Sequence, residues 1–369
     1  MKYKLSVIPG DGIGPEITKC GIQIIECINN KLNIEFEINK IKAGDKALKE
    51  EGIALSEQTI RDIKNTDACI KAPVGETAMD VIVKIRQLFD LYANLRPAKS
   101  FPTVKSLQDD IDILIVRENT EDLYKGQEFK IDDKVIALRT ISEKASTRIA
   151  EYAFNCAKNR RKKVTSVHKA NVLKITDGLF ANCVKNVSKH YKNIDYSELY
   201  VDACAMNLIR NPKEFDVIVT TNMFGDILSD EAAQVVGGLG LAPSANIGEK
   251  FALFEPVHGA APDIAGKNIA NPIAMILSIK MMMDWFYDYK NDNECKIASE
   301  IIHKAVVSSL ENNVKTIELG GNSSTEKIGH IAIIYPLGII FNKGIVFPSM
   351  SSNSKWFRIN TNTTNSRGT

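Results

Sequence analysis

The chain has 369 residues, with 47 Lys and Arg against 45 Asp and Glu, which leaves a net charge of +2. This length favours two α/β-sized domains, and the near-neutral charge argues against an electrostatic grip on nucleic acid or on anionic lipid. The seven cysteines include no C-x-x-C pair, and no apolar run approaches the roughly 18 residues of a membrane span or forms a signal peptide. These features predict a cytoplasmic protein with small-molecule or protein partners, without a disulfide framework or a zinc site.

The N-terminal segment reads as a strand over residues 4–8 that enters the turn PGDGIGPE and then a helix. Gly10 and Gly12 fit the dinucleotide-binding fingerprint, but its third glycine would fall on Pro15. A plain tight turn explains the segment equally well. The following helix has one apolar face, which consists of Ile17, Cys20, Ile24 and Ile28.

The stretch DVIVKIRQLFDLYANLRP, residues 80–97, predicts a helix that carries Arg86, with Ile82 and Val83 on the same face. Thr77 and Asp80 mark its start in a capping-box arrangement. A guanidinium beside branched apolar side chains suits a small acid that is anionic at one end and apolar at the other. On this segment alone, a core-facing helix with a solvated arginine at its edge is the alternative.

Later strands bring charged residues to their carboxyl ends, where ligands gather in open α/β sheets. A strand over 67–73 precedes the helix just described, and a strand over 111–116 leads to Arg117, with Tyr124 in the loop that follows. The segment VTSVHKAN places Lys169 at the end of another strand. Helical patterns over 144–160 and 177–190 complete an alternating α/β layout.

Three aspartates are candidate metal ligands. Asp226 and Asp230 follow the strand of FDVIVTT and stand at i and i+4, so both carboxylates share one helix face, and Asp202 is a third candidate. Oxygen ligands of this kind select hard cations such as Mg²⁺ or Mn²⁺. The alternative is that Asp226 and Asp230 are first-turn acids that stabilise a helix dipole.

Residues 237–272 are rich in Gly, Ala, Pro and Asn, and a connection of this length predicts a binding loop. His258 offers a stacking imidazole, and Asp263 would bind a ribose diol and repel a 2′-phosphate, which favours NAD over NADP if this is the cofactor site. An apolar helix over 272–287 follows. From about Ile331 the pattern breaks into a Ser/Thr/Asn tail, so residues 331–369 are expected to be disordered, and a frameshifted or read-through C-terminus is a hypothesis for them.

Six segments together resemble the β-decarboxylating dehydrogenases, the isocitrate/isopropylmalate dehydrogenase family, and most nearly its archaeal-type isopropylmalate enzymes. They are GDGIGPE, LRP preceded by R-x-x-x-D-x-Y, RENTEDLYKG, HKAN, NMFGDILSD and VHGAAPDIAGKNIANP, in order over residues 5–328. The resemblance implies a two-domain α/β fold that is not a Rossmann fold, with mixed central sheets flanked by helices. It implies a discontinuous large cofactor-binding domain, 1–98 with 240–330, and a small domain, 99–239, that carries the dimer interface and the metal and acid/base residues.

The same resemblance implies the cofactors NAD and Mg²⁺ or Mn²⁺ and a role for each matching residue. Arg86, Arg96 and Arg117 would bind the substrate carboxylates, and Tyr124 and Lys169 would form the acid/base pair. Asp202, Asp226 and Asp230 would bind the metal, with Lys169 and Asp202 supplied by the second subunit of a homodimer or larger homo-oligomer. The cofactor-binding positions would be Ile13, Glu255, His258, Gly259, Ala261, Asp263 and Asn271.

The helix before Arg86 bears on the choice of substrate. Isocitrate enzymes of the family have Ser and Asn at the positions of Asp80 and Ile82, and homoisocitrate enzymes tend to have an additional arginine at Val83. Apolar residues here would leave a third carboxylate unpaired, whereas an isopropyl group gains about 0.8 kcal/mol per buried methylene. The expected reaction is therefore the oxidative decarboxylation of 3-isopropylmalate, a 2-hydroxy-3-carboxy acid, to 4-methyl-2-oxopentanoate in leucine biosynthesis.

Alternatives within the family are an isocitrate or homoisocitrate dehydrogenase, or a broad enzyme that acts on β-carboxymalates such as D-malate and tartrate. A non-catalytic regulatory subunit is an alternative of another class. Such a subunit is expected to lack catalytic residues, but Tyr124, Lys169 and the three aspartates are all present.

Overall fold

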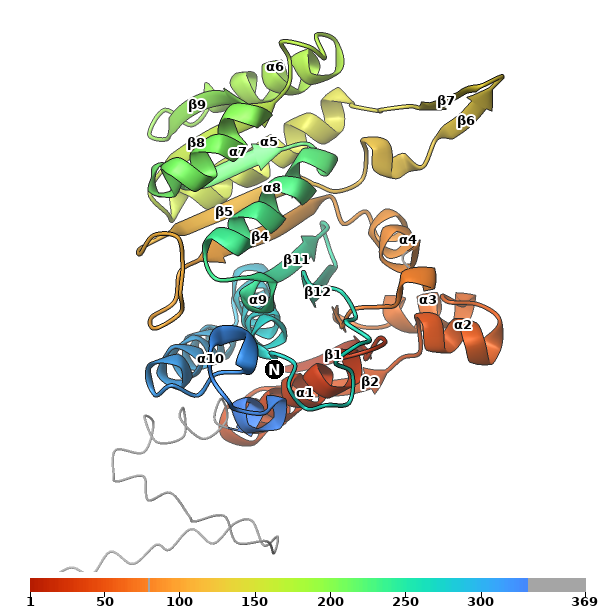
Figure 1. The fold of residues 1–369 in the computed structure, drawn as a ribbon, viewed down its shortest axis with the longest axis vertical. Helices are drawn as coiled ribbons and strands as arrows, with labels where there is room; N and C mark the ends of the chain where they lie inside the picture. Colours follow the sequence, from red (N-terminus) through yellow and green to blue (C-terminus); the bar gives the residue numbers. More distant parts are fainter. Residues whose placement is uncertain (79, 331–369) are drawn as a thin grey trace, which may run out of the picture.

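The computed structural model describes residues 1–78 and 80–330. Its centre is one ten-stranded sheet with helices on both faces (Figure 1). In spatial order the strands are β2 (Glu35–Lys40), β1 (Lys2–Ile8), β3 (Ala68–Lys71), β12 (Ala252–Pro256), β11 (Pro243–Ile247), β4 (Ala93–Lys99), β5 (Asp112–Glu118), β10 (Val217–Thr220), β8 (Lys163–His168) and β9 (Asp195–Tyr200). The pairs β12–β11, β11–β4 and β4–β5 are antiparallel and the other neighbours are parallel. The predicted α/β class with a mixed sheet is confirmed.

The helices form two layers. On one face, α1 (Gly14–Lys31), α5 (Glu143–Lys158), α6 (Thr176–Ser188), α9 (Ile273–Lys290) and α10 (Asn293–Glu311) share one large apolar core. On the other face, α3 (Glu57–Lys64) and α4 (Asp80–Leu88) cover one apolar cluster, with α2 (Asp45–Glu51) beside them, while α7 (Val201–Arg210) and α8 (Asn222–Val235) cover a second one. The short 3₁₀ turns are η1 (Glu76–Ala78), η2 (Leu123–Lys125), η3 (Pro212–Glu214), η4 (Leu239–Leu241) and η5 (Ile317–Leu319).

A small hairpin of β6 (Glu128–Ile131) and β7 (Lys134–Ala137) projects from the body of the molecule (Figure 1). Among residues 1–78 and 80–330, no helix is both long and apolar enough to span a bilayer.

The alternation of side chains along the strands explains where the polar residues meet. On β5, Leu114 and Val116 enter the large core, whereas Ile113 and Ile115 face α7 and α8, so Arg117 faces α8 as well. The same alternation places a row of polar side chains between the two apolar clusters of that face. The row consists of Lys71 on β3, Glu255 on β12, Ser244 and Asn246 on β11, Asn94 and Arg96 on β4, and Arg117 on β5.

Most of the expected elements are present. The strand predicted over 4–8 lies within β1, and the four residues of the predicted apolar face of α1 are all buried. The helices predicted over 144–160, 177–190 and 272–287 correspond to α5, α6 and α9.

Two local predictions were wrong. The segment 237–272 is not one loop, because β11 and β12 lie within it, and every residue of these two strands is buried. Both faces of these strands are covered, so their residues do not alternate between apolar and polar. Their small and polar residues therefore did not indicate strands. Thr77 does not cap α4, since it lies in η1 and its hydroxyl donates to the carboxylate of Asp45. The domain boundaries remain a prediction, and the expected tail, 331–369, lies outside the described residues.

Candidate active site

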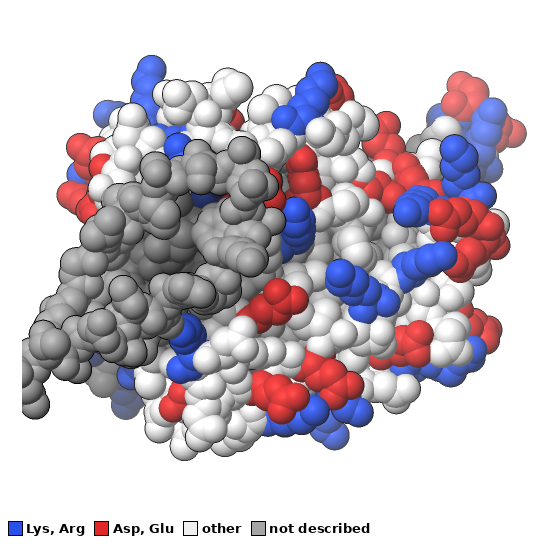
Figure 2. Space-filling view, turned by 90° about the horizontal axis from the view of Figure 1, so that it is seen from below, with Lys and Arg blue, Asp and Glu red and all other residues white. Residues whose placement is uncertain are grey.

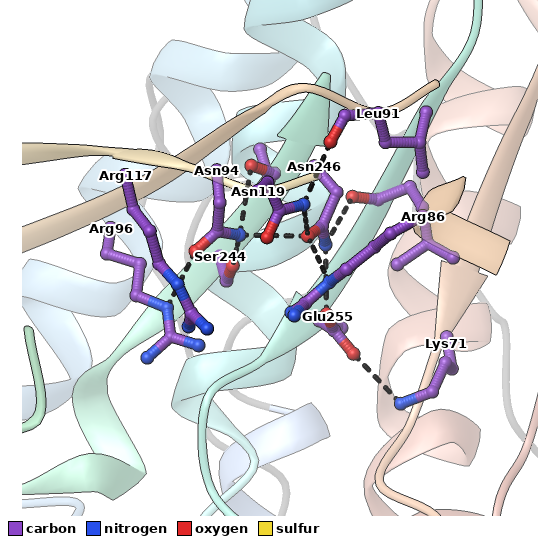
Figure 3. A network of polar contacts seen from close by, with 12 residues as sticks. Lys71, Arg86, Leu91, Asn94, Arg96, Arg117, Asn119, Ser244, Asn246 and Glu255 are labelled. Atoms are coloured by element: carbon purple, nitrogen blue, oxygen red, sulfur yellow. Dashed lines mark hydrogen bonds and ion pairs between the residues drawn. The ribbon is translucent and has the colours of Figure 1, made fainter. Parts of the chain in front are cut away.

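Arg86 enters the polar row from the last turn of α4. Val81 and Ile85 anchor this helix in the apolar cluster beneath it, and the guanidinium reaches the central strands. Its Nε donates to Asn246 Oδ1 at 2.9 Å and its Nη2 to Glu255 Oε1 at 3.2 Å (Figure 3). Lys71 Nζ donates to the other oxygen of Glu255 at 2.8 Å. Burial alone would raise the pKa of Glu255, but Lys71 and Arg86 lower it to about 2, so the carboxylate is ionised at neutral pH.

Asn246 connects Arg86 with the neighbouring strands. Its Oδ1 also accepts hydrogen bonds from Asn94 Nδ2 at 2.9 Å and from Asn119 Nδ2 at 3.0 Å. The Oδ1 atom of Asn94 in turn accepts from Arg96 Nε at 2.8 Å. Two buried amides therefore link the guanidinium groups of Arg86 and Arg96 (Figure 3).

The sequence interpretation missed Lys71, Asn94 and Asn246 as parts of the site. A signal was present in each case, because each is a polar residue within a largely apolar segment, IKAP, YANL or PSANI. A buried polar side chain of this kind requires hydrogen-bond partners.

Arg96 and Arg117 lie against α8, which carries two of the expected metal ligands. Arg96 Nη1 donates to Ser229 Oγ at 2.8 Å and forms ion pairs of 3.1 Å with Asp226 and with Asp230. Arg117 Nε donates to Asn222 Oδ1 at 2.9 Å, and its Nη1 contacts Asp226. Asp226 and Asp230 therefore share one helix face, as their spacing predicted, and they also share Arg96.

Tyr124 completes this group from η2. Its hydroxyl donates to Asp226, and Arg117 stacks on its ring at 5.0 Å from the centroid. Burial, Arg96 and Arg86 lower the pKa of Arg117 to about 9. Burial acts to raise the pKa of Asp226, but Arg117 and Arg96 outweigh it and hold that pKa below its ordinary value. Among the described residues, Arg117 Nη2 is buried without a partner, which leaves a donor for an anionic ligand.

Lys169 and Asp202 form a separate pair. Lys169 directly follows β8, and its Nζ donates to Asp202 Oδ1, in the first turn of α7, at 2.6 Å. This hydrogen bond lowers the pKa of Asp202. Within residues 1–78 and 80–330, no cluster of three or more His, Cys, Asp or Glu side chains could hold a metal ion. One chain thus brings two of the three expected ligands together, and the third lies apart from them.

Most of the expected cofactor positions lie in the turn after β1 and in the segment after β12. Ile13 N donates to Ala260 O at 2.8 Å, and a Cβ atom on Gly12 would overlap the same carbonyl, so glycine allows the two segments to approach closely. In this segment Ala261 has a φ of +40°, His258 Nδ1 is 3.1 Å from Gly259 O, and the side chain of Asp263 is exposed.

Two polar atoms in this region lack a hydrogen-bond partner among the described residues. His258 Nε2 and Asn271 Nδ2 are both buried without a partner in the described part of the chain. Burial lowers the pKa of His258, which favours the neutral imidazole. Glu255 differs from the other expected cofactor residues, because it lies within β12 and pairs with Arg86 and Lys71.

Comparisons with known proteins identify the family of this chain. The isocitrate/isopropylmalate dehydrogenase family matches residues 4–331, and the chain belongs to this family. A 3-isopropylmalate dehydrogenase from Saccharolobus solfataricus is 50% identical over 328 residues, which cover 89% of this chain and 97% of that protein. A homoisocitrate dehydrogenase from Methanocaldococcus jannaschii is 49% identical over 350 residues, with 90% and 97% covered.

Among solved structures, isocitrate dehydrogenase from Methylococcus capsulatus has a TM-score of 0.82 and 40% identity, and the match covers 90% of this chain and 99% of that one. The protein is therefore a dehydrogenase of the isocitrate/isopropylmalate type. The family, the enzyme class and the fold predicted from the motifs are confirmed.

Proposed function

We propose that this protein oxidises 3-isopropylmalate at C2 with NAD and releases the β-carboxylate as CO₂, which yields 4-methyl-2-oxopentanoate in leucine biosynthesis. One observation carries the choice of substrate. Ile82 and Val83 are half-buried on α4, one turn before the buried Arg86. A hydroxy acid whose carboxylates meet the arginines would place its third substituent against these apolar side chains, where an isopropyl group is favoured over a carboxylate.

The chain's own residues have separate roles in this reaction. Arg86, Arg96 and Arg117 bind and orient the two carboxylates, since planar guanidinium groups pair with carboxylates in a fixed geometry. Lys169 accepts the proton of the C2 hydroxyl, directly or through water, and Tyr124 donates a proton to the carbon that loses CO₂.

Asp226 and Asp230 provide hard oxygen donors on one helix face, which fits Mg²⁺ or Mn²⁺, with Asp202 as the third carboxylate from a second subunit. When bound, this cation polarises the hydroxyl and the adjacent carboxylate.

The unpartnered polar atoms of His258 and Asn271 support an NAD site formed with Ile13, Gly259 and Ala261. Asp263 is exposed beside them and supports NAD over NADP, because a carboxylate binds a ribose diol and repels a 2′-phosphate. Glu255 would act in this site only indirectly, through the position of Arg86 and Lys71.

Exposed apolar surface supports a homodimer. Met206 and Ile209 on α7 and Ile227 on α8 are 59%, 56% and 59% exposed on neighbouring helices. Val135, on β7 of the projecting hairpin, is 72% exposed. Apolar side chains exposed on two neighbouring helices are typical of an interaction site. Lys and Arg are interspersed with Asp and Glu on the visible described surface (Figure 2), which supports a cytoplasmic enzyme without a nucleic-acid or membrane partner.

The test is a comparison of kcat/KM for 3-isopropylmalate, isocitrate, homoisocitrate and D-malate, with NAD and Mg²⁺. We expect 3-isopropylmalate to give the highest value by about tenfold or more, because a carboxylate against Ile82 and Val83 would lose its hydration without gaining a partner. A higher value for isocitrate or homoisocitrate would overturn the choice of substrate. NADP at the same concentration serves as the cofactor control.

A further inference from the structure

A buried ion cluster lies outside the substrate arginines, and its centre is Arg139. The guanidinium of Arg139 stands between Asp122 and Asp177, and the side-chain exposures are 11% for the arginine and 0% for each aspartate. Its Nε donates to Asp122 Oδ1 at 2.6 Å, and its Nη1 contacts Asp177 Oδ1. Each aspartate leads to a different part of the proposed catalytic machinery.

Asp122 connects the cluster with Tyr124. It precedes η2, and its Oδ1 accepts from Leu123 N at 2.9 Å, so this carboxylate fixes the start of the turn that carries the tyrosine. The backbone of Asp122 has a φ of +70°, a conformation that residues other than glycine rarely adopt. Several hydrogen bonds to one carboxylate can hold such a strained residue in place.

Asp122 also reaches α8. Its Oδ2 accepts from Met223 N at 3.1 Å and so caps the helix that carries Asp226 and Asp230, whereas the adjacent Thr221 makes no side-chain cap. Arg139 supports the same helix start, because its Nη2 donates to Thr221 Oγ1 at 2.8 Å and its guanidinium lies 4.9 Å from the ring centroid of Phe224.

Asp177 connects the cluster with Lys169. This aspartate lies in the first turn of α6, and its Oδ2 accepts from the backbone N–H of Lys169 at 2.6 Å. One carboxylate therefore contacts both the Arg139 guanidinium and the residue that is proposed to accept the hydroxyl proton.

We propose that Arg139 is a positioning residue that sets the Tyr124 turn, the Lys169 backbone and the start of α8 relative to one another. The inference rests on the roles proposed above for Tyr124 and Lys169. A guanidinium suits this task because it donates in several fixed directions of one plane, whereas an ammonium is a compact point charge. A misplacement of about 1 Å can cost on the order of 100-fold in rate, so a loosened cluster should impair turnover more than substrate binding.

The test compares Arg139→Lys with a matched control, Arg160→Lys. Arg160 also pairs with two carboxylates, Asp216 at 2.8 Å and Asp112 at 2.7 Å. Those partners lie at the amino ends of β10 and β5, away from Arg117 at the other end of β5. Both substitutions keep the positive charge and remove the planar guanidinium, so the general cost of losing an arginine that pairs with two carboxylates appears in both.

We expect Arg139→Lys to lower kcat for 3-isopropylmalate by about 10-fold to 100-fold, with the KM for this acid changed by less than about threefold. Hydrogen–deuterium exchange should accelerate at residues 120–126 and at residues 168–173 in this variant. Arg160→Lys should leave kcat per folded enzyme and the exchange of both segments unchanged. If Arg139→Lys fails to fold, Asp177→Asn replaces it as the test. This variant keeps an acceptor for Lys169 N–H but loses the ion pair with Arg139, so exchange should accelerate at residues 168–173 alone.

An unchanged kcat in Arg139→Lys, or an equal loss of kcat in both variants, would overturn the positioning role. Unaltered exchange in both segments would do the same. Hydrogen–deuterium exchange does not require turnover, so it tests the link between Arg139 and the two segments even if the wild-type enzyme acts on none of the four acids. Such inactivity would count against the proposed function alone.

Discussion

Asn246 is the residue at which the hydrogen bonds of Arg86 and Arg96 meet. Its Oδ1 accepts from Arg86, Asn94 and Asn119, and its Nδ2 donates to Glu255 at 2.9 Å. An apolar side chain here would leave several buried donors without acceptors, at a cost of about 1–3 kcal/mol for each unsatisfied group. The direction of the Arg86 guanidinium is therefore set by an uncharged amide as well as by its ion pair with Glu255.

Glu255 should make stability depend on acid pH. Lys71 and Arg86 lower its pKa from 4.5 to about 2 against the opposing effect of burial. A group with a depressed folded-state pKa stabilises the fold above its unfolded-state pKa, and this contribution is lost as the pH falls through the folded-state value. We expect the free energy of unfolding of the wild type to exceed that of Glu255→Gln by a constant amount above about pH 5, and this excess to shrink between about pH 4.5 and pH 2.

Urea unfolding of both proteins at several pH values between 3 and 7 measures this difference. Glu249→Gln is the control, because Glu249 is exposed in the connection between β11 and β12. A difference between wild type and Glu255→Gln that stays constant over the whole range would contradict the assignment.

At the scale of elements, the sequence predicted those features that depend on local spacing. The shared face of Asp226 and Asp230 follows from the helix period, and the position of Lys169 after β8 follows from the strand pattern. The partner of Arg86 could not be predicted in this way, because Glu255 lies 169 residues away in the chain. Nor did composition reveal β11 and β12, which α9 covers on one face and whose polar side chains on the other face, Ser244, Asn246 and Glu255, belong to the buried polar row.

The position of α8 depends on Gly225. A Cβ atom at this residue would lie 2.6 Å from Arg117 Cγ and 2.7 Å from Arg117 Cβ, closer than side chains pack. Gly→Ala within a helix ordinarily stabilises by about 0.5–1 kcal/mol, but here α8 or Arg117 would have to move. We expect Gly225→Ala to lower the melting temperature and to reduce kcat/KM by about tenfold or more, because Asp226 moves with the helix.

Gly178→Ala is the matched control. Gly178 lies in the first turn of α6, and a Cβ atom there meets nothing within 4 Å. This variant should keep full activity and match or exceed the wild-type melting temperature. Equal behaviour of the two variants in thermal unfolding and steady-state kinetics would show that α8 has room to adapt.

At the scale of the whole molecule, one sheet runs beneath both apolar clusters, and the polar row occupies the interval between them. This arrangement gathers Arg86, Arg96, Arg117, Tyr124 and Asp226 within one chain. Lys169 lies apart from that group and is hydrogen-bonded to Asp202. On the same side of the molecule, α7 and α8 expose apolar residues. In the homodimer proposed above, a second copy would cover this surface and supply its own Lys169 and Asp202 to the site.

The proposed sharing of sites between subunits predicts complementation between two inactive variants. Tyr124→Phe and Lys169→Met should each abolish turnover as homodimers. In a mixed dimer, one site combines both lesions, while the other combines an intact Tyr124 from one subunit with an intact Lys169 from its partner. Random exchange makes about half of the dimers mixed with one working site of two, so about a quarter of wild-type activity should return. The measurement is kcat after the variants are unfolded and refolded together, with each variant refolded alone as the control. If both groups acted within one chain, the mixture would stay inactive.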